Sequence, residues 1–486
     1  MMILSLLNPT VLMIVLSFRS FEANARTPLS TIFTENYPHH VSDGEDPGKP
    51  LFLTPYLEAG KIEEARNLSL AGKLAGAEGT DSYTGFLTVN KKYNSNMFFW
   101  FVPAKVDSKN APVLLWLQGG PGGSSLFGLF VENGPFKISK DFKLSMRPVT
   151  WQTKYSMLYI DNPVGTGFSF TDNDSGYARN ETDVANDLYS ALTQFFQIYY
   201  EYQDNEFYAT GESYAGKYVP AICYKIHIEN PYSRFRINLK GMAIGDGLID
   251  PENMFPAYGD AIFNIGQIDE IQRDHFNNQT NIASKYIQDE QWTKCFMIFD
   301  VLLNGDVSKQ PSYYYNASGV HDYYNFLRTE APKEFGYYNT YLSMGGVRKA
   351  IHVGNLTYND GSKVEQNLIE DICKSVKPWL IELLNSDYKV LLYSGQLDII
   401  VSAPLTERFL WMLPWKHLSD YQKADRKVWK VQKTDTEVAG YVRAVGPGNG
   451  NFFQVIVRGA GHLAPFDQPE RVLNMLNRFI EGNSWK

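Results

Sequence analysis

One serine lies in a sequence context that is typical of catalytic nucleophiles. The segment Gly211-Glu212-Ser213-Tyr214-Ala215-Gly216 follows an apolar run that ends at Ala209 and precedes a helical pattern over residues 219–226. A strand, a tight turn and a helix in this order form a nucleophile elbow, which exposes the serine hydroxyl above a sheet and points the helix N-terminus at it. The strict pattern has Gly where Ala215 stands, and Ala is small enough for the sharp turn. Ser213 is therefore the candidate nucleophile.

Asp398 and His462 are the residues that could activate this serine. A serine hydroxyl needs a neighbouring base to take its proton, and the base needs an acidic partner to fix its tautomer. Asp398 follows the apolar run Val390–Tyr393, and His462 lies in a glycine-rich turn after the run Phe453–Val457. Their order along the chain, Ser, acid and His, is the order used by this kind of elbow. The sequence thus predicts a triad of Ser213, Asp398 and His462.

A glycine-rich loop could supply the anion-binding part of such a site. The segment Gly119-Gly120-Pro121-Gly122-Gly123 follows the apolar run Val113–Leu117. Taken alone it is only a flexible turn, but glycines allow backbone N–H groups to approach an anion closely. One N–H group of this loop, together with that of Tyr214, would form an oxyanion hole beside Ser213.

These residues must be positioned by a mostly parallel sheet, because each follows a predicted strand and parallel sheets bind ligands at that edge. Apolar runs recur along the chain, each ending in a turn and usually followed by a helical pattern, as in βαβ units. The predicted strands are residues 97–101, 113–117, 157–160, 206–209, 242–244, 390–393 and 453–457. Predicted helices include one behind Asn180 and one that opens at Pro469. We predict an α/β-hydrolase fold with helices on both faces.

Residues 250–344 interrupt this pattern. They are rich in Asn, Gln, Asp and aromatic residues and show only weaker helical patterns, such as Ile268–His275. An interruption of this length between two strands predicts an inserted cap subdomain over the site. The α/β-hydrolase core then comprises residues 51–249 and 345–486, preceded by a polar lead at residues 26–50.

The N-terminal 25 residues are predicted to be a signal peptide. An apolar stretch over residues 11–18 precedes Ala23-Asn24-Ala25, which fits the signal-peptidase pattern, and it is too short to span a membrane. Six N-x-S/T sequons are compatible with the secretory pathway, at Asn67, Asn173, Asn180, Asn278, Asn316 and Asn355. We expect a glycosylated protein that is secreted or lysosomal and has no membrane span.

The composition excludes some classes of function. The 486 residues are 44% hydrophobic, and their net charge of −8 is not accompanied by any run of Lys and Arg, so we expect no nucleic-acid partner. Three cysteines allow at most one internal disulfide and leave its pairing open. The sequence has no C-x-x-C or His-x-x-x-His spacing, so we expect no metal and no cofactor. The oligomeric state is not determined by the sequence, and a homodimer remains open.

Taken together, these motifs resemble the serine carboxypeptidases, peptidase family S10. The matching segments are Gly119–Gly122 with Ser124 and Ser125, Asp161–Ser169, Gly211–Gly216, and Gly461 with His462. The resemblance extends from about Leu51 to the C-terminus. The segments Trp116–Ser125 and Asn316–Leu327 look like the vitellogenic-like carboxypeptidase branch.

The resemblance implies a serine-type carboxypeptidase that hydrolyses the C-terminal peptide bond of peptides or proteins through an acyl-enzyme on Ser213, with an acidic pH optimum. The N–H groups of Gly120 and Tyr214 would form the oxyanion hole. The terminal carboxylate of the substrate would be bound by three groups, the side chain of Gln118, the N–H of Gly119 and the side chain of Glu212.

The chain departs from the family pattern at two positions. Many members have Asn where this chain has Gln118, whose amide still donates but is one methylene longer. Many also have a disulfide-bonded Cys where this chain has Gly123, so the attachment of the cap is left open. Two alternatives remain, an acyltransferase that uses the same triad and a secreted glycoprotein with a mainly binding role. The presence of both Gln118 and Glu212 favours the peptidase.

Overall fold

The central element of the fold is a ten-stranded sheet. The computed structural model describes residues 41–446 and 450–485, so the predicted signal peptide and residues 26–40 of the polar lead lie outside the described residues. The strand order is β1-β2-β6-β3-β8-β9-β11-β14-β13-β12. The strands are β1 (Tyr83–Asn90), β2 (Ser95–Val102), β3 (Val113–Leu117), β6 (Ser156–Ile160), β8 (Phe207–Glu212), β9 (Leu239–Gly245), β11 (Lys389–Gly395), β12 (Lys427–Trp429), β13 (Gly440–Val445) and β14 (Phe452–Val457).

The middle of the sheet is parallel and its edges are antiparallel. Strands β6, β3, β8, β9, β11 and β14 pair in parallel. The pairs β1–β2, β2–β6, β14–β13 and β13–β12 are antiparallel. Each predicted strand overlaps one of these strands, which confirms the prediction of a mostly parallel sheet. Strands β1, β12 and β13 were not predicted, because Thr84 and Thr88 interrupt the apolar pattern of β1 and the other two are partly exposed.

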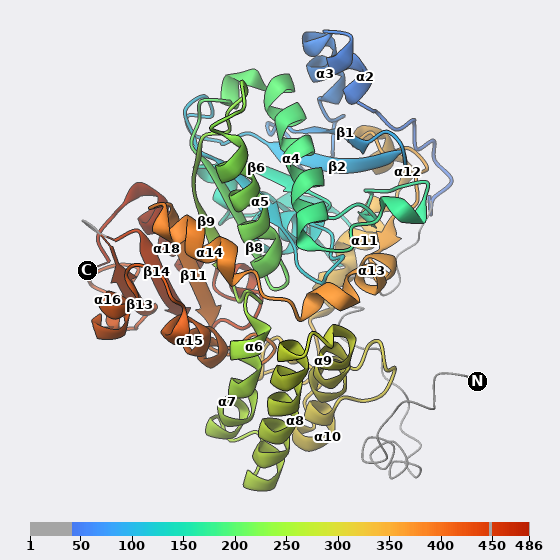
Figure 1. Ribbon diagram of the computed structural model, residues 1–486. Coiled ribbons are helices and arrows are strands. Elements are labelled where there is room, and N and C mark those ends of the chain that lie inside the picture. The colour runs from blue at the N-terminus through green and yellow to red at the C-terminus, as the bar shows by residue number, and fades with distance from the viewer. Residues whose placement is uncertain (1–40, 447–449, 486) are drawn as a thin grey trace.

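Helices flank the sheet and carry the expected capping signals. The helices α4 (Glu181–Ile198), α5 (Ala215–Glu229) and α14 (Lys377–Asn385) lie across the front of the sheet in Figure 1. The Asn180 side chain accepts the N–H of Asp183 and so caps α4, as predicted. Helix α18 (Pro469–Glu481) opens at the predicted proline and packs its apolar side against β14.

Residues 251–318, in the segment between β9 and β11, form a group of helices below the sheet in Figure 1. They are α6 (Pro251–Met254), η6 (Phe255–Ala257), α7 (Tyr258–Asn264), α8 (Glu270–Gln288), α9 (Trp292–Phe299), η7 (Asp300–Asn304) and α10 (Tyr313–Ser318). Helix α8 is much longer than the predicted pattern at residues 268–275, because exposed Asn and Gln residues obscure its apolar side. The cap boundaries at residues 250 and 344 stay a prediction.

Shorter elements complete the chain. They are α2 (Thr54–Glu58), α3 (Ile62–Ser69), η2 (Gly128–Glu132), β4 (Phe136–Ile138), β5 (Leu144–Met146), η3 (Trp151–Thr153), β7 (Thr166–Gly167), η4 (Asp174–Gly176), η5 (Tyr200–Tyr202), η8 (Lys333–Gly336), α11 (Tyr337–Leu342), α12 (Gly345–Ala350), β10 (Asn359–Asp360), α13 (Ser362–Ile372), α15 (Ala403–Met412), α16 (Leu418–Lys423) and α17 (Ala464–Asp467). A disulfide joins Cys295 in α9 to Cys373 at the end of α13, while Cys223 is a buried free thiol. The open question of cysteine pairing is thereby answered.

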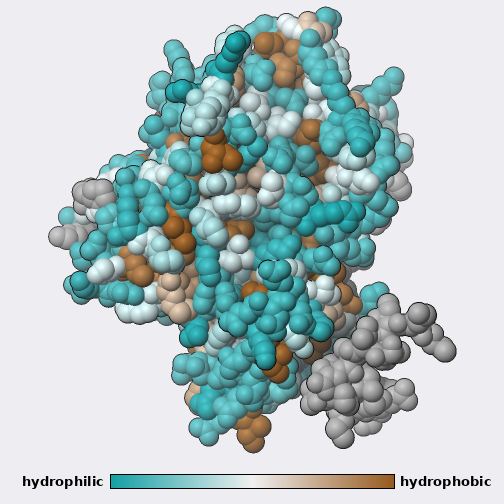
Figure 2. All heavy atoms as spheres, viewed as in Figure 1, coloured by the Kyte–Doolittle hydropathy of each residue, from teal (hydrophilic) through white to brown (hydrophobic). Residues whose placement is uncertain are grey.

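The surface is mainly hydrophilic on the side shown in Figure 2, where hydrophobic residues form small separate patches. Within residues 41–446 and 450–485, no helix has both the length and the apolar character needed to cross a membrane.

Candidate active site

Ser213 occupies a strained turn between β8 and α5. Its φ angle is +61°, in the left-handed region that residues with a side chain rarely adopt. The turn is held by hydrogen bonds from the Ser213 N–H to the Gly245 carbonyl and from the Leu248 N–H to the Ser213 carbonyl, each 3.0 Å. A Cβ on Gly216 would lie 2.6 Å from the Leu248 nitrogen, so this position requires glycine. The turn has the geometry of a nucleophile elbow, as the sequence predicted.

His462 and Asp398 form a buried pair beside the elbow. The Nδ1 atom of His462 lies 2.9 Å from Oδ2 of Asp398, and both side chains are almost fully buried. The N–H groups of Ile400 and Val401 donate to the two oxygens of Asp398 at 3.0 and 3.2 Å. The Nε2 atom of His462 has no hydrogen-bond partner within the described part of the chain. Asp398 therefore fixes Nδ1 as the protonated nitrogen and leaves Nε2 as the basic one.

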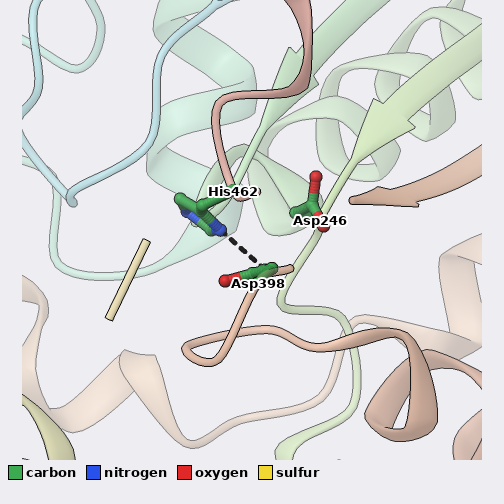
Figure 3. A group of neighbouring side chains, drawn as sticks. All are labelled: Asp246, Asp398 and His462. Atoms are coloured by element: carbon green, nitrogen blue, oxygen red, sulfur yellow. Dashed lines mark hydrogen bonds and ion pairs between the residues drawn. The ribbon is translucent and has the colours of Figure 1, made fainter. Parts of the chain in front are cut away.

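Two residues that the sequence analysis missed hold this pair in place. Figure 3 shows Asp246, from the loop after β9, beside Asp398. The Asp246 Oδ1 atom accepts the N–H of Gly395 at 2.8 Å, and burial followed by the charge of Asp398 raises the pKa of Asp246 well above its usual value. The ring of Tyr324 stacks on that of His462 with 4.7 Å between centroids, and the Tyr324 carbonyl accepts the His462 N–H.

Asp246, Asp398 and His462 also lie close enough together to be considered as metal ligands. Their contacts favour another interpretation. Backbone N–H groups already donate to both oxygens of Asp398 and to one oxygen of Asp246, and the His462 nitrogen nearest them is hydrogen-bonded to Asp398. Such donors stabilise a network of carboxyl groups and imidazole, whereas a cation would have to displace them.

The glycine-rich loop after β3 packs directly on the elbow. A Cβ on Gly119 would lie 2.6 Å from Cβ of Ser213 and 2.7 Å from the nitrogen of Tyr214. The φ angle of Gly120 is +114°, which also requires glycine. The backbone of Gly119 and Gly120 can therefore face the same reacting atom as the N–H of Tyr214.

A buried ion pair lies next to the ring of Tyr214. The Nζ atom of Lys217 lies 2.7 Å from Oδ2 of Asp371 and 5.2 Å from the centre of the Tyr214 ring. Lys217 is fully buried, as is Glu181, whose pKa is raised to about 8 by burial although Lys217 lowers it. Removing one partner of such a buried pair leaves an uncompensated charge, so this network fixes the first turn of α5.

Gln118 and Glu212 are brought together as the sequence predicted. The Gln118 Nε2 atom donates to Oε1 of Glu212 at 2.8 Å, and its Oε1 atom accepts the indole N–H of Trp116 at 2.9 Å. Both side chains are buried, Glu212 completely. The Trp116 contact fixes which end of the Gln118 amide faces Glu212, so the amide group presents an N–H donor at this place.

Glu132 faces Glu212, and sequence reasoning missed it. It is the last residue of η2 and is 1% exposed. Burial raises the pKa of Glu132 to about 8. Burial, followed by the charge of Glu132, raises the pKa of Glu212 well above its usual value. Two buried carboxyl groups in contact retain a proton between them. A glutamate directly after the apolar stretch Leu126–Val131 was the available signal.

Comparison with known proteins identifies the family. A model of the family described as serine carboxypeptidase, Peptidase_S10, matches residues 74–482. The chain belongs to the serine carboxypeptidase family. The probable serine carboxypeptidase CPVL of Homo sapiens is 57% identical over 440 residues, which are 90% of this chain and 91% of the relative. These findings confirm both the predicted family and the activity, that of a serine carboxypeptidase.

Two further relatives and one solved structure agree with this assignment. The venom serine carboxypeptidase of Apis mellifera is 47% identical, covering 97% of this chain and 99% of the relative. The vitellogenic carboxypeptidase of Aedes aegypti is 43% identical over 90% of this chain and 91% of the relative, which supports the predicted branch. The crystal structure of Kex1Δp, a prohormone-processing carboxypeptidase from Saccharomyces cerevisiae, has a TM-score of 0.74 at 24% identity, covering 85% of this chain and 95% of that chain. It confirms the α/β-hydrolase fold.

A cavity of about 230 Å³ opens beside Ser213 of this serine carboxypeptidase. Ser213, Tyr214 and Gly120 line one end of it. Apolar side chains line another part, namely Leu248, Phe296, Phe299, Ile372, Ile400 and Val401. Asp306, Asp360 and Glu365 also line it. Gln118, Gly119 and Glu212 are not among the lining residues.

The six sequons differ in accessibility. Asn67, Asn173, Asn278, Asn316 and Asn355 are exposed. Asn180 is half-buried, and its Nδ2 atom, the atom to which a glycan would be attached, donates to Asp183. The geometry is therefore less suitable for a glycan at Asn180 than at the other five, and glycosylation at all six stays a prediction.

Proposed function

We propose that Ser213, His462 and Asp398 carry out the carboxypeptidase reaction. His462 Nε2 removes the proton of Ser213 as its oxygen attacks the carbonyl carbon of the C-terminal peptide bond. The N–H groups of Gly120 and Tyr214 bind the oxyanion that forms. The protonated His462 then gives its proton to the leaving amino group, and the acyl chain remains on Ser213. A water molecule, activated by the same imidazole, releases the shortened peptide.

The terminal carboxylate of the substrate is bound in our proposal by Gln118, the N–H of Gly119 and Glu212. The 2.8 Å contact between Gln118 and Glu212 and their place next to the elbow are the observations that support this role. Glu212 must carry a proton to donate to a second carboxylate, and its raised pKa supports that state at acidic pH. We therefore propose an acidic pH optimum.

We further propose that the protein acts in the secretory pathway, either secreted or in lysosomes. Support comes from the predicted signal peptide at residues 1–25, from the five exposed sequons, and from the venom serine carboxypeptidase of Apis mellifera among the relatives. Its substrates are peptides with a free C-terminus.

The 2.9 Å contact between His462 and Asp398 beside the elbow carries this proposal, and labelling tests it. A fluorophosphonate probe is expected to modify the purified protein at Ser213, and Ser213→Ala should abolish both labelling and the release of a C-terminal residue. Peptides with an amidated C-terminus should be cut much more slowly than free ones, because Gln118 and Gly119 lose their charged partner. Equal cleavage of both peptides, or labelling of another serine, would contradict the proposed roles. Transfer of the acyl group to an added alcohol instead of water would favour the acyltransferase.

A further inference from the structure

The proposed base and its acidic partner come from two separate segments of chain. Asp398 lies in the segment after β11, and His462 lies in the segment after β14 (Figure 3). The two segments meet through the 2.9 Å contact between these side chains and through a hydrogen bond of 2.7 Å from the Leu397 N–H to the Ala460 carbonyl. A base is effective only while its ring keeps one orientation toward the nucleophile, so the relative position of the two segments matters for the reaction.

Residues 322–328, in the loop after α10, contact both of these segments, and we call them the bridging segment. On the Asp398 side, the contacts are made by backbone groups. The Tyr323 carbonyl accepts the Ile399 N–H at 3.1 Å, and the Phe326 N–H donates to the Leu397 carbonyl at 3.1 Å. The bridging segment therefore follows the chain on either side of Asp398.

On the other side, the bridging segment lies directly against the His462 turn. The Tyr324 carbonyl accepts the His462 N–H at 2.7 Å, and the Tyr324 ring stacks on the imidazole with 4.7 Å between centroids. A Cβ on Gly461 would collide with the Tyr324 carbonyl oxygen, so this close approach requires glycine. A shift of the bridging segment would therefore move the imidazole through both its backbone and its ring.

The side chain of Asp467 ties the bridging segment to the His462 turn. Asp467 is the last residue of α17, and its side chain is 3% exposed. Its Oδ2 atom accepts the Gly461 N–H at 2.7 Å and the Asn325 Nδ2 group at 2.9 Å. Its Oδ1 atom accepts an N–H of the Arg328 guanidinium. Three donors from two segments thus converge on one buried carboxylate.

This arrangement requires a carboxylate and not only a polar side chain. All three partners of Asp467 are donors, and a carboxylate accepts on both of its oxygens. The guanidinium of Arg328 supplies the opposite charge. An amide at this position would turn its NH₂ group toward one of the donors, so asparagine cannot reproduce the contacts.

From these contacts we infer that Asp467 is a positioning residue for the carboxypeptidase reaction, which sets the His462 ring relative to Asp398 by fixing the bridging segment to the His462 turn. The inference rests on the proposed function, in which His462 is the base. Asp467 is not among the residues that line the cavity beside Ser213, so it acts through its neighbours and not on the substrate.

Steady-state kinetics of the full-length protein test this role. Asp467→Asn should lower kcat by about tenfold or more and leave KM within about twofold of the parent, because the substrate carboxylate is bound in our proposal by Gln118 and Glu212. The assay is run at about pH 5. Burial and, to a lesser extent, the charge of Asp467 raise the pKa of Glu132, and at this pH the Glu132–Glu212 pair keeps its protons.

Labelling gives a second measure of the same step. The rate at which a fluorophosphonate modifies Ser213 should fall in parallel with kcat, because this reaction also needs the base. Glu470→Gln is the matched control, since Glu470 is an exposed acid in the first turn of the next helix. It should match the parent in kcat, KM and labelling rate.

A proton resonance provides a readout that a loss of stability alone would not move. The Nδ1 proton of His462, held against Asp398, should give a downfield signal in the folded parent, assigned by its absence in His462→Ala. In Asp467→Asn, measured well below the unfolding midpoint, this signal should shift or broaden, because the ring no longer keeps one geometry. Glu470→Gln should leave the signal unchanged.

If Asp467→Asn does not fold, its partners test the same contacts one at a time. Arg328→Ala and Asn325→Ala each remove one donor of the bridging segment and keep the Gly461 contact, so each should lower kcat by about threefold. Arg328→Lys should recover part of that loss, because an ammonium group still donates to the carboxylate.

The outcomes separate this role from the proposed function. A folded Asp467→Asn with the parent's kcat or with an unchanged His462 signal would overturn the inference, as would folded Arg328→Ala and Asn325→Ala variants that keep the parent's kcat. A parent that is not labelled at Ser213, or whose labelling survives His462→Ala, would instead contradict the proposed catalytic roles.

Discussion

At the scale of single residues, two groups of buried carboxyls lie near the proposed nucleophile. Glu132 and Glu212 form one with Gln118, and Asp246 and Asp398 form the other with His462. In each group an aspartate or glutamate with a raised pKa lies next to an acid with a proposed role in the reaction. Because a protonated carboxyl group is a hydrogen-bond donor, one acid of each pair can donate to the other: Glu212 to Glu132, and Asp246 to Asp398.

The Glu132–Glu212 pair predicts how substrate affinity depends on pH. Both pKa values are raised, that of Glu132 to about 8, so the pair holds its protons at acidic pH and becomes negative as the pH rises through that value. The negative pair would repel the substrate carboxylate. For the parent, KM is expected to stay level at acidic pH and to rise as the pH passes about 8.

Glutamine at either position should flatten this rise, because an amide donates without titrating. We would measure KM and kcat against pH for the parent, Glu212→Gln and Glu132→Gln, with the exposed Glu370→Gln as control. A parent KM that does not change with pH would show that Glu212 does not face the substrate carboxylate.

Asp246 is a positioning residue in our interpretation, and its role predicts a contrast between two substitutions. Its raised pKa keeps it protonated, so it donates to Asp398 while it accepts the Gly395 N–H. Asp246→Asn retains a donor and an acceptor and should keep kcat within about threefold of the parent. Asp246→Ala removes both and should lower kcat by about tenfold or more.

The pH profile distinguishes this role from a purely structural one. The parent's kcat should decline at alkaline pH when Asp246 ionises beside Asp398, and the decline should be absent in Asp246→Asn. If kcat declines at alkaline pH in the same way for the parent and for Asp246→Asn, the proposal that Asp246 donates to Asp398 is contradicted.

At the scale of elements, the site is assembled from strand ends. The segments after β3, β8, β9, β11 and β14 supply the glycine-rich loop, Ser213, Asp246, Asp398 and His462. A parallel sheet brings these ends to one edge, which is why the sequence could predict that Ser213, Asp398 and His462 come from neighbouring strand ends. Glu132 and Tyr324 come from segments that lack the apolar runs typical of strands. Their approach to the site depends on the packing of η2 and of the loop after α10. No local pattern encodes such packing.

The disulfide Cys295–Cys373 connects two elements that line the cavity. Helix α9 contributes Phe296 and Phe299, and α13 contributes Glu365 and Ile372. The cross-link closes 78 residues of chain, and removing it should lower the free energy of unfolding by about 2–4 kcal/mol.

The double variant Cys295→Ser with Cys373→Ser should show a lower unfolding midpoint and a higher KM, since the cavity walls are no longer tied together. Cys223→Ala is the control, because Cys223 is the free thiol and burial raises its pKa far out of the reactive range. An unchanged KM and midpoint in the double variant would show that packing alone holds α9 against α13.

At the scale of the whole molecule, buried acids outnumber the cations that could neutralise them. The net charge is −8. Carboxyl groups with raised pKa values are spread over the fold, with burial as the first cause in each, namely Glu132, Asp161, Glu181, Asp187, Glu212, Asp246, Asp322 and Glu365. Each is more basic in the folded chain than in the unfolded one, so together they link folding to proton binding.

This linkage predicts that the protein is most stable in acid. For a carboxyl group whose folded pKa is raised, the folded state binds more protons between the two pKa values, so the free energy of unfolding falls as the pH rises through that window. The raised values are about 6 for Asp322, about 7 for Asp161 and about 8 for Glu132. With unfolded values near ~4, the window runs from about pH 4 to about pH 8.

The midpoint of thermal unfolding is therefore expected to be highest between about pH 4.5 and pH 5.5 and to fall steadily toward pH 8. Over this range the free energy of unfolding should decrease by up to about 1.4 kcal/mol per pH unit for each such group. At a pH below this maximum, the free energy of unfolding should fall again. Burial raises the pKa of Glu407, but its contact with Arg443 outweighs burial and lowers the pKa, so acid must protonate a carboxylate that the folded protein stabilises. Glu365→Gln should reduce the slope above pH 5 and raise the midpoint at pH 8, whereas the exposed Glu370→Gln should leave the curve unchanged. A midpoint that climbs from pH 5 to pH 8 in the parent would mean that these carboxyl groups are ionised in the folded protein, and the shared-proton interpretation of the Glu132–Glu212 pair would fail with it.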